Sequence, residues 1–147
     1  MQVGEVMTKS CRFVNANDTL RKAAEIMAAE DIGILPVADK DRLIGMISDR
    51  DIVVRSLARG GNGKAHVRDA MTKNVKYCFE DADLDDTLEN MAEIKVRRLP
   101  VMNREKRLVG MVSLSDAARL YSPDAVGLAF SEVVTPVDDD TIESGIV

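Results

Sequence analysis

The chain has 147 residues, 46% of them hydrophobic, which is enough to bury the core of one domain or of two closely packed halves. Its formal net charge of −5 argues against the broad basic surface that nucleic-acid binding requires. No apolar run approaches the length of a membrane-spanning helix, and the amino terminus MQVGEVMTKS lacks the apolar stretch of a signal peptide, so we expect a cytoplasmic protein without membrane contact.

Residues 12–30 predict a short strand followed by a helix. The strand is expected at Arg12 to Val14. Asn17 or Asp18 is expected to cap the helix, because both side chains accept hydrogen bonds from the first backbone N–H groups of a helix. Apolar residues at helical spacing predict the buried face: Leu20, Ala24, Met27 and Ala28.

Residues 32–61 predict a hairpin and a second helix. The apolar runs IGILPV (Ile32 to Val37) and LIGMI (Leu43 to Ile47) are separated by the polar turn ADKDR, which is typical of two antiparallel strands. Ser48 is expected to cap the second helix, and Gly60 and Gly61 are expected to end it. The first half of the chain therefore predicts a β-α-β-β-α unit.

The second half of the sequence repeats the first. Matching residues recur at one spacing: Met7 and Met71, Leu20 and Leu84, Met27 and Met91, Pro36 and Pro100. The spacing grows by one residue in the polar turn after the prolines, as expected for two copies of one supersecondary unit. The second copy has a predicted strand at Tyr77 to Phe79 and an apolar helix face at Leu84, Leu88, Met91 and Ala92. We expect residues 1–60 and 67–121 to form two domains, joined by a linker at residues 61–66.

Residues 122–147 extend beyond the repeat. The stretch SPDAVGLAFSEVV predicts a further helix that starts after Pro123 and ends at Thr135-Pro136. Its apolar face is expected at Val126, Phe130, Val133 and Val134, which would cover the module or join two subunits. The acidic tail VDDDTIESGIV is expected either to pack or to remain solvated.

Each predicted hairpin ends in the pattern G-h-h-S-x-x-D, where h is apolar: GMISDRD at Gly45 to Asp51 and GMVSLSD at Gly110 to Asp116. Ser-x-x-Asp before an apolar helix is close to a capping box, in which the two residues exchange side-chain and backbone hydrogen bonds. The start of a helix also attracts anions, because its N–H groups and its positive dipole end face outward. Both readings, a cap and a ligand site, are open.

Three motifs occur twice in the same order. They are VGEVMT and VRDAMT, ILPV and RLPV, and the two G-h-h-S-x-x-D patterns. Residues 1–121 resemble a pair of cystathionine β-synthase (CBS) domains, the tandem arrangement called a Bateman module. The resemblance implies an α/β (α+β) fold of two β-α-β-β-α units related by pseudo-twofold symmetry, packed through their sheets, with adenine nucleotides often held in the clefts between them. It also implies that two modules form a flat homodimer, and apolar helix faces exposed on a flat module favour the same association.

The resemblance implies roles for the matching Ser and Asp residues. Asp51 and Asp116 would accept hydrogen bonds from the hydroxyl groups of a ribose. Ser48 and Ser113 would reach the ribose or a phosphate. The alternative is that all four residues only cap helices.

Other candidate ligand residues differ between the two copies. Arg50 lies inside the first motif, whereas Arg97 and Arg98 precede the second RLPV proline. Arginine suits phosphate because its planar donors engage two oxygens at once, although each of the three could be an ordinary surface residue. Ile34 and Leu99, ahead of the two prolines, would line an adenine slot or form plain core.

No residue set predicts catalysis. GGNGK departs from a phosphate-binding loop at Ala58 and Ala65, and His66 is a single histidine without a suggested partner. Cys11 and Cys78 lack a nearby Cys or His, so we expect reduced thiols and no zinc. The acidic residues do not follow the spacing of a metal site. We expect no enzyme, no metal and no required cofactor.

Three hypotheses about function follow. The first is a regulatory module that binds an adenine nucleotide (AMP, ADP, ATP or a related adenosyl ligand) in the cleft between the two CBS units and modulates a protein partner. The alternative is a ligand-independent homodimeric scaffold whose Ser-x-x-Asp pairs are caps alone. A third, an enzyme with a hidden site, has no residue set to support it. The sequence names neither the partner nor the adenosyl ligand.

Overall fold

The computed structural model of the protein describes residues 1–9 and 12–136. These residues form two compact units. The repeat-one unit is Arg12–Val75, and the repeat-two unit combines the first residues of the chain, up to Lys9, with the described residues from Lys76 onward. Each unit thus joins the body of one repeat to the leading segment of the other, VRDAMT in the first case and VGEVMT in the second. The predicted packing of the two units about a pseudo-twofold axis stays a prediction.

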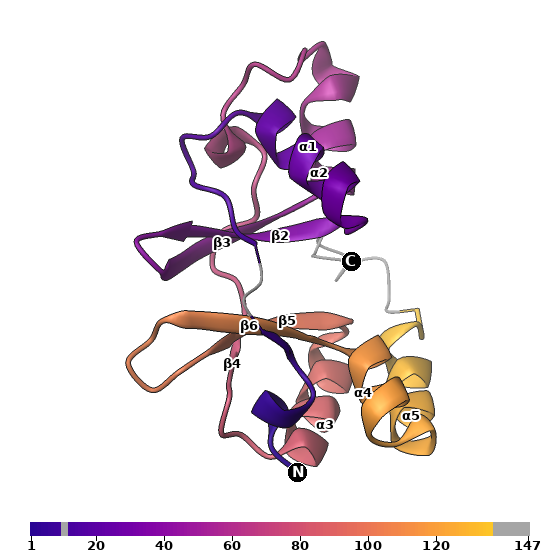
Figure 1. Cartoon of the computed structure of the whole chain (residues 1–147). Coiled ribbons are helices and arrows are strands. Elements are labelled where there is room, and N and C mark those ends of the chain that lie inside the picture. The colour runs from indigo at the N-terminus through magenta and orange to yellow at the C-terminus, as the bar shows by residue number, and fades with distance from the viewer. Residues whose placement is uncertain (10–11, 137–147) are drawn as a thin grey trace. The chain divides into compact units, whose positions relative to one another are not determined.

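The repeat-one unit has the predicted order of a helix, a hairpin and a helix (Figure 1). These elements are α1 (Leu20–Glu30), β2 (Ile34–Asp39), β3 (Arg42–Ser48) and α2 (Asp49–Arg55). The short helices η2 (Leu57–Arg59) and η3 (Val67–Asp69) follow. The predicted strand at residues 12–14 is reduced to one parallel bridge between Val14 and Val37. Gly60, at φ 91°, ends η2, whereas α2 already ends at Arg55, so the prediction that the glycines end the second helix was wrong.

The start and the buried face of α1 differ from the prediction. Thr19 is the cap, and its hydroxyl accepts from the Lys22 N–H at 3.1 Å. Asp18 instead accepts from the Asn15 N–H at 2.9 Å and holds the preceding turn. The buried residues are Leu20, Ala23, Ile26 and Met27, whereas Ala24 and Ala28 are exposed. The helix is rotated so that Ile26 is buried, which removes more apolar area from water than an alanine would.

The repeat-two unit contains η1 (Val3–Glu5), α3 (Leu84–Ile94), α4 (Leu114–Leu120) and a four-stranded sheet. The strand order is β1 (Thr8–Lys9), β6 (Leu108–Ser113), β5 (Arg98–Met102) and β4 (Cys78–Phe79). β4 runs parallel to β5, which confirms the predicted strand at residues 77–79. The predicted face of α3 is also confirmed, because Leu84, Leu88, Met91 and Ala92 are all buried.

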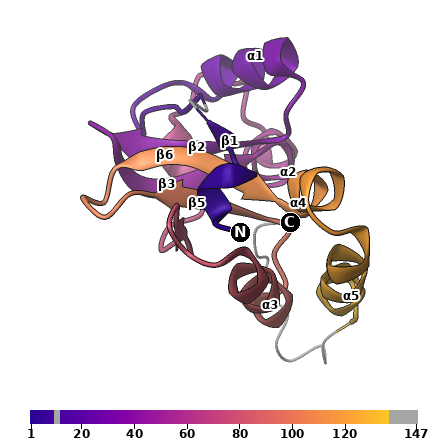
Figure 2. The same ribbon diagram turned by 60° about the horizontal axis from the view of Figure 1, so that its bottom comes forward.

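The predicted helix of the extension is α5 (Pro123–Val133), with Ser122 as its cap. It packs against α3 and α4 and so covers the repeat-two unit (Figure 2). Its buried residues are Val126 and Ala129. Phe130 and Val134 are 43% and 46% exposed, so the predicted apolar face was only partly right. The acidic tail at residues 137–147 and Cys11 lie outside the described residues.

Each unit has its own apolar core. The helix-facing residues of the hairpins, Leu35 and Val37 in one unit and Leu99 and Val101 in the other, are completely or almost completely buried. Cys78 is buried in the repeat-two core. Within the described residues, no helix combines the length and the apolar character needed to cross a membrane.

The glycines that begin the two G-h-h-S-x-x-D motifs, Gly45 and Gly110, lie in close contact with the backbone of the leading segments VRDAMT and VGEVMT. In β6, Gly110 pairs with Lys9, and a Cβ on Gly110 would lie 2.5 Å from the Thr8 carbonyl oxygen. In β3, a Cβ on Gly45 would lie 2.7 Å from the Thr72 carbonyl oxygen. Both distances are shorter than non-bonded carbon and oxygen atoms tolerate, so a side chain at either position would displace the segment.

We therefore expect Gly110→Ala to lower the free energy of unfolding by about 1–3 kcal/mol, the usual cost of overpacking a close contact. Gly127→Ala is the matched control, because a Cβ at this position in α5 meets nothing within 4 Å. The control should stabilise by about 0.5–1 kcal/mol, since alanine is the better helix former. Urea unfolding measures both changes. An unchanged stability of Gly110→Ala would show that the chain tolerates a side chain at this contact.

A second prediction concerns Cys78. Burial raises the pKa of its thiol from 9.0 to about 12. In a Cys11→Ser variant, the remaining thiol should not react with a disulfide reagent at pH 8 until urea unfolds the protein. The contribution of this group to stability should be complete below pH 9 and decrease as the pH rises toward 12, because only the unfolded thiol ionises there. Rapid reaction of the folded variant would show that the thiol is accessible.

Candidate functional site

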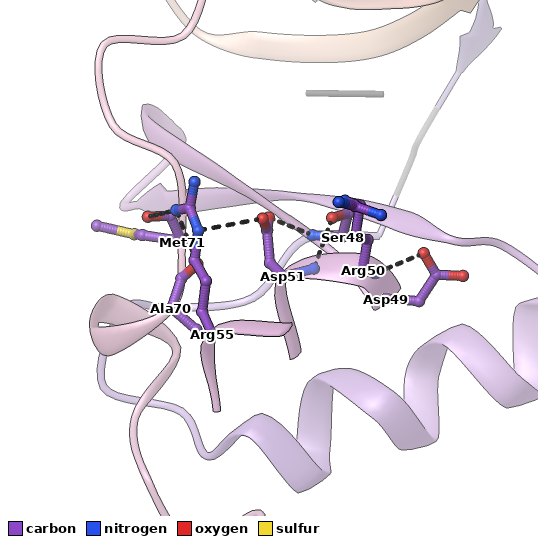
Figure 3. Close-up of polar contacts among 7 residues, drawn as sticks. All are labelled: Ser48, Asp49, Arg50, Asp51, Arg55, Ala70 and Met71. Atoms are coloured by element: carbon purple, nitrogen blue, oxygen red, sulfur yellow. Dashed lines mark hydrogen bonds and ion pairs between the residues drawn. The ribbon is translucent and has the colours of Figure 1, made fainter. Parts of the chain in front are cut away.

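Both Ser-x-x-Asp motifs form reciprocal caps at the junction of strand and helix. The Ser48 hydroxyl accepts from the Asp51 N–H at 3.0 Å, and the Ser48 N–H donates to Asp51 Oδ2 at 2.9 Å (Figure 3). Ser113 and Asp116 make the same two bonds at 3.1 and 3.3 Å. The predicted capping boxes are therefore confirmed in both units.

The caps leave the two carboxylates with acceptor capacity. Asp51 Oδ1 lies 3.7 Å from Arg55 Nε, and Asp116 Oδ1 lies 3.3 Å from Arg119 Nη2. An ionised carboxylate has about four lone-pair sites. One cap bond and one arginine contact leave room for a hydroxyl donor, so capping and ribose binding are compatible at both residues.

Arg55 ties the first cap to the leading segment of repeat two. Its Nη1 group donates to the carbonyl oxygens of Ala70 and Met71 at 3.3 and 3.2 Å, while its Nε atom faces Asp51 (Figure 3). Leu120 occupies the matching place in the repeat-two unit and is 52% exposed. A leucine side chain cannot make these bonds, so the two caps have different surroundings.

A hollow of about 300 Å³ lies at the hairpin end of the repeat-two unit. Its polar walls are Arg97, Arg98, Ser113 and Ser115. Its apolar walls are Leu114, Ala118, Val126 and Phe130. Ligand pockets usually measure about 300–1,000 Å³, so the hollow has the size of a small ligand site.

The hollow brings together three of the residues predicted for the second site. The strand register places Arg98 opposite Ser113, and the Arg97 carbonyl oxygen accepts from the Leu114 N–H at 3.0 Å. Asp116 is 9% exposed and caps the helix that begins beside the hollow. Ser115 was missed from the sequence, although the motif SLSD displays it one residue before the aspartate.

The two residues predicted for an adenine slot lie in different surroundings. Leu99 is 2% exposed and belongs to the core of the repeat-two unit, which favours the plain-core alternative. Ile34 is 7% exposed and lies opposite Ser48 in the hairpin register. Ile34 therefore occupies the place that Arg98 has in the other unit.

The hairpin end of the repeat-one unit has mixed charge. Gly33 stands where the other unit has Arg97, and a Cβ on this glycine would lie 3.0 Å from Asp49 Oδ2. Asp49 is acidic, whereas its counterpart is Leu114. The exposed Arg50 guanidinium has no hydrogen-bond or ion-pair partner in the described part of the chain, and Arg50 engages Asp49 only through its backbone N–H, at 2.8 Å.

The described residues do not contain a cluster of three or more His, Cys, Asp or Glu side chains suited to a metal ion. None of the described residues that line the hollow is acidic. The lowered pKa of Asp81 arises from its side-chain hydrogen bond with Arg104, and neither residue lines the hollow. Within this part of the chain, the arrangement at the hollow suits binding of an anion.

Comparison with known proteins gives the family. The CBS domain family model matches residues 3–57 and 67–123. Hypoxic response protein 1 of Mycobacterium tuberculosis is 35% identical over 135 residues, which cover 90% of this chain and 94% of that protein.

Two solved structures are similar in fold and in sequence. The CBS domain pair of protein MJ0100, in complex with 5′-methylthioadenosine and S-adenosyl-L-methionine, has a TM-score of 0.73 and 28% identity, covering 84% of this chain and 98% of that one. CBSX2 in complex with AMP has a TM-score of 0.69 and 28% identity, covering 80% and 93%. The chain belongs to the CBS domain family and carries two tandem copies of the domain.

Proposed function

We propose that this chain is a regulatory module that binds an adenosyl ligand such as AMP and changes the activity of a protein partner in response. The observation that carries the proposal is the hollow of the repeat-two unit, where two arginines and two serines meet beside the Asp116 cap. The adenosyl ligands in the MJ0100 and CBSX2 complexes support the same ligand class. We propose neither an enzymatic activity nor a required cofactor.

The chemistry of the hollow suggests how such a ligand would bind. Arg97 and Arg98 present planar donors to a phosphate, and the Ser113 and Ser115 hydroxyls add donors beside them. Asp116 would accept a hydrogen bond from a ribose hydroxyl, because the cap uses only part of the acceptor capacity of its carboxylate. The adenine would lie in the cleft that we expect between the two units, with Ile34 as a candidate wall residue.

A phosphate should favour the repeat-two end of the module. Its hollow carries two arginines, and none of its described lining residues is acidic. The repeat-one end offers Arg50 beside Asp49, whose negative charge opposes an anion. Ser48 and Asp51 remain candidates for a second ligand that carries less negative charge.

A homodimeric scaffold is the second candidate function. Both caps are satisfied by the protein itself, and α2 and η2 expose Val53, Val54 and Leu57 to 51%, 43% and 61%. Apolar groups exposed together often mark an interface between subunits. A dimer in light scattering that binds no adenylate at millimolar concentration would favour the scaffold.

Calorimetric titration tests the phosphate site. AMP should bind the unaltered chain, and Arg98→Ala should weaken AMP binding by about 1.5–3 kcal/mol, the usual value of a hydrogen bond to a charged group. Adenosine, which has no phosphate, should lose much less affinity. Arg50→Ala is the matched control from the other repeat and should change AMP affinity little. Equal losses for AMP and adenosine would assign Arg98 to structure.

Asp116→Asn separates ribose binding from capping. The amide oxygen can still accept the Ser113 N–H, so the thermal unfolding of Asp116→Asn should change little, while AMP affinity should fall by about 1.5–3 kcal/mol. Asp116→Ala removes the cap as well and should lower the free energy of unfolding by about 0.5–2 kcal/mol. Asp51→Asn is the control in repeat one. Unchanged AMP affinity of Asp116→Asn would leave this residue with a capping role alone.

A further inference from the structure

The extension helix α5 forms part of the wall of the repeat-two hollow. The family match ends at residue 123, so α5 lies almost entirely outside it. Val126 and Phe130 nevertheless line the hollow together with Arg97, Arg98 and the two serines. Val126 is 7% exposed and belongs to the core, whereas Phe130 is 43% exposed. Phe130 is therefore the α5 side chain that is both in the hollow and accessible.

Phe130 is in direct contact with one of the phosphate candidates. The Arg97 guanidinium carbon lies over its ring, 5.3 Å from the centroid. The attraction between a guanidinium and the face of an aromatic ring is electrostatic and does not require a conventional hydrogen bond. The ring can therefore hold Arg97 in place without occupying the donors that a phosphate would use.

Two further contacts fix α5 at its ends. Near the amino end, the Tyr121 hydroxyl donates to Asp85 Oδ2 at 2.7 Å. At the carboxyl end, Lys95 Nζ donates to the carbonyl oxygens of Glu132 and Thr135 at 2.7 and 3.2 Å. Lys95 ends α3 with φ 56° and lies two residues before Arg97. The short segment that carries Arg97 is thus attached to α5 through both Lys95 and the Phe130 ring.

We propose that Phe130 of α5 is a positioning residue of the ligand site, so that occupation of the repeat-two hollow and docking of α5 are coupled. This inference rests on the proposed function. The ring orients Arg97 toward the anion, and an anion that fixes Arg97 strengthens its contact with the ring. Because such coupling is reciprocal, any partner that displaced α5 would also weaken ligand binding. The docking of α5 would then depend on whether the hollow is occupied, and a protein partner that contacts α5 would respond to the ligand.

The affinity series tests positioning. Phe130→Leu keeps an apolar side chain and removes the ring, so AMP should bind about 2- to 5-fold more weakly, the fold-change of an exposed cation–π contact. Adenosine affinity should not change, and Phe130→Tyr, which restores a ring, should restore AMP affinity. Leu128→Ala is the control on the same helix, because Leu128 is 78% exposed and does not line this hollow. Equal AMP affinity in Phe130→Leu and the unaltered chain would overturn the proposal.

A fluorescent reporter tests whether the ligand reaches the α5 wall of the hollow, which the coupling requires. The chain has no tryptophan, so Phe130→Trp introduces a single indole at the hollow. AMP should change its emission saturably, with a midpoint equal to the calorimetric Kd, and Leu128→Trp should not respond. Calorimetric binding of AMP without any change in Phe130→Trp emission would overturn the coupling and leave the proposed function standing. Absence of calorimetric binding to the unaltered chain would overturn both.

Discussion

Each hairpin passes directly from its second strand into a seven-residue helix, and the reciprocal hydrogen bonds of Ser-x-x-Asp hold that junction. Isolated helices shorter than about 12–15 residues are marginal in water, so a helix this short depends on its cap and its packing. The cap also fixes where the neighbouring side chains lie. In repeat two, Arg97 is bonded through its backbone to the first residue of α4, and Arg98 pairs with Ser113. The structural role of the motif therefore creates the arrangement on which a ligand role depends.

The repeated sequence predicted the elements that depend on local pattern. The hairpins, both caps, the α3 face and the existence of α5 follow from apolar periodicity, turn residues and capping residues that lie close together in the chain. Thr19 was missed because Asn17, Asp18 and Thr19 all suit a cap, and the choice depends on the Asn15 turn that occupies Asp18.

Features that depend on distant contacts were not predicted. The similarity of VGEVMT and VRDAMT shows that the two segments are equivalent, but it does not show that each packs on the other repeat's hairpin. Gly45 and Gly110 allow the backbone of these segments to approach closely, and no pattern of neighbouring residues in the sequence indicates these contacts. Phe130 was assigned to an apolar helix face, whereas its ring lies at the hollow and contacts Arg97. The two residues are more than thirty positions apart in the chain, so no local pattern indicates this contact. The two hairpin ends thus share a backbone design but differ in chemistry: one has Gly33 and Asp49, and the other has Arg97 and Leu114, with α5 as an added wall.

The central claim is that the repeat-two hollow binds the phosphate of an adenosyl ligand. Backbone amide spectra recorded during an AMP titration test it most directly, because they report both repeats in one experiment. The account predicts that the amide signals of residues 97–98, 113–116 and 130 shift together and saturably, with smaller changes at residues 48–51. Shifts confined to residues 48–51, or no saturable shift at any of these positions, would contradict it.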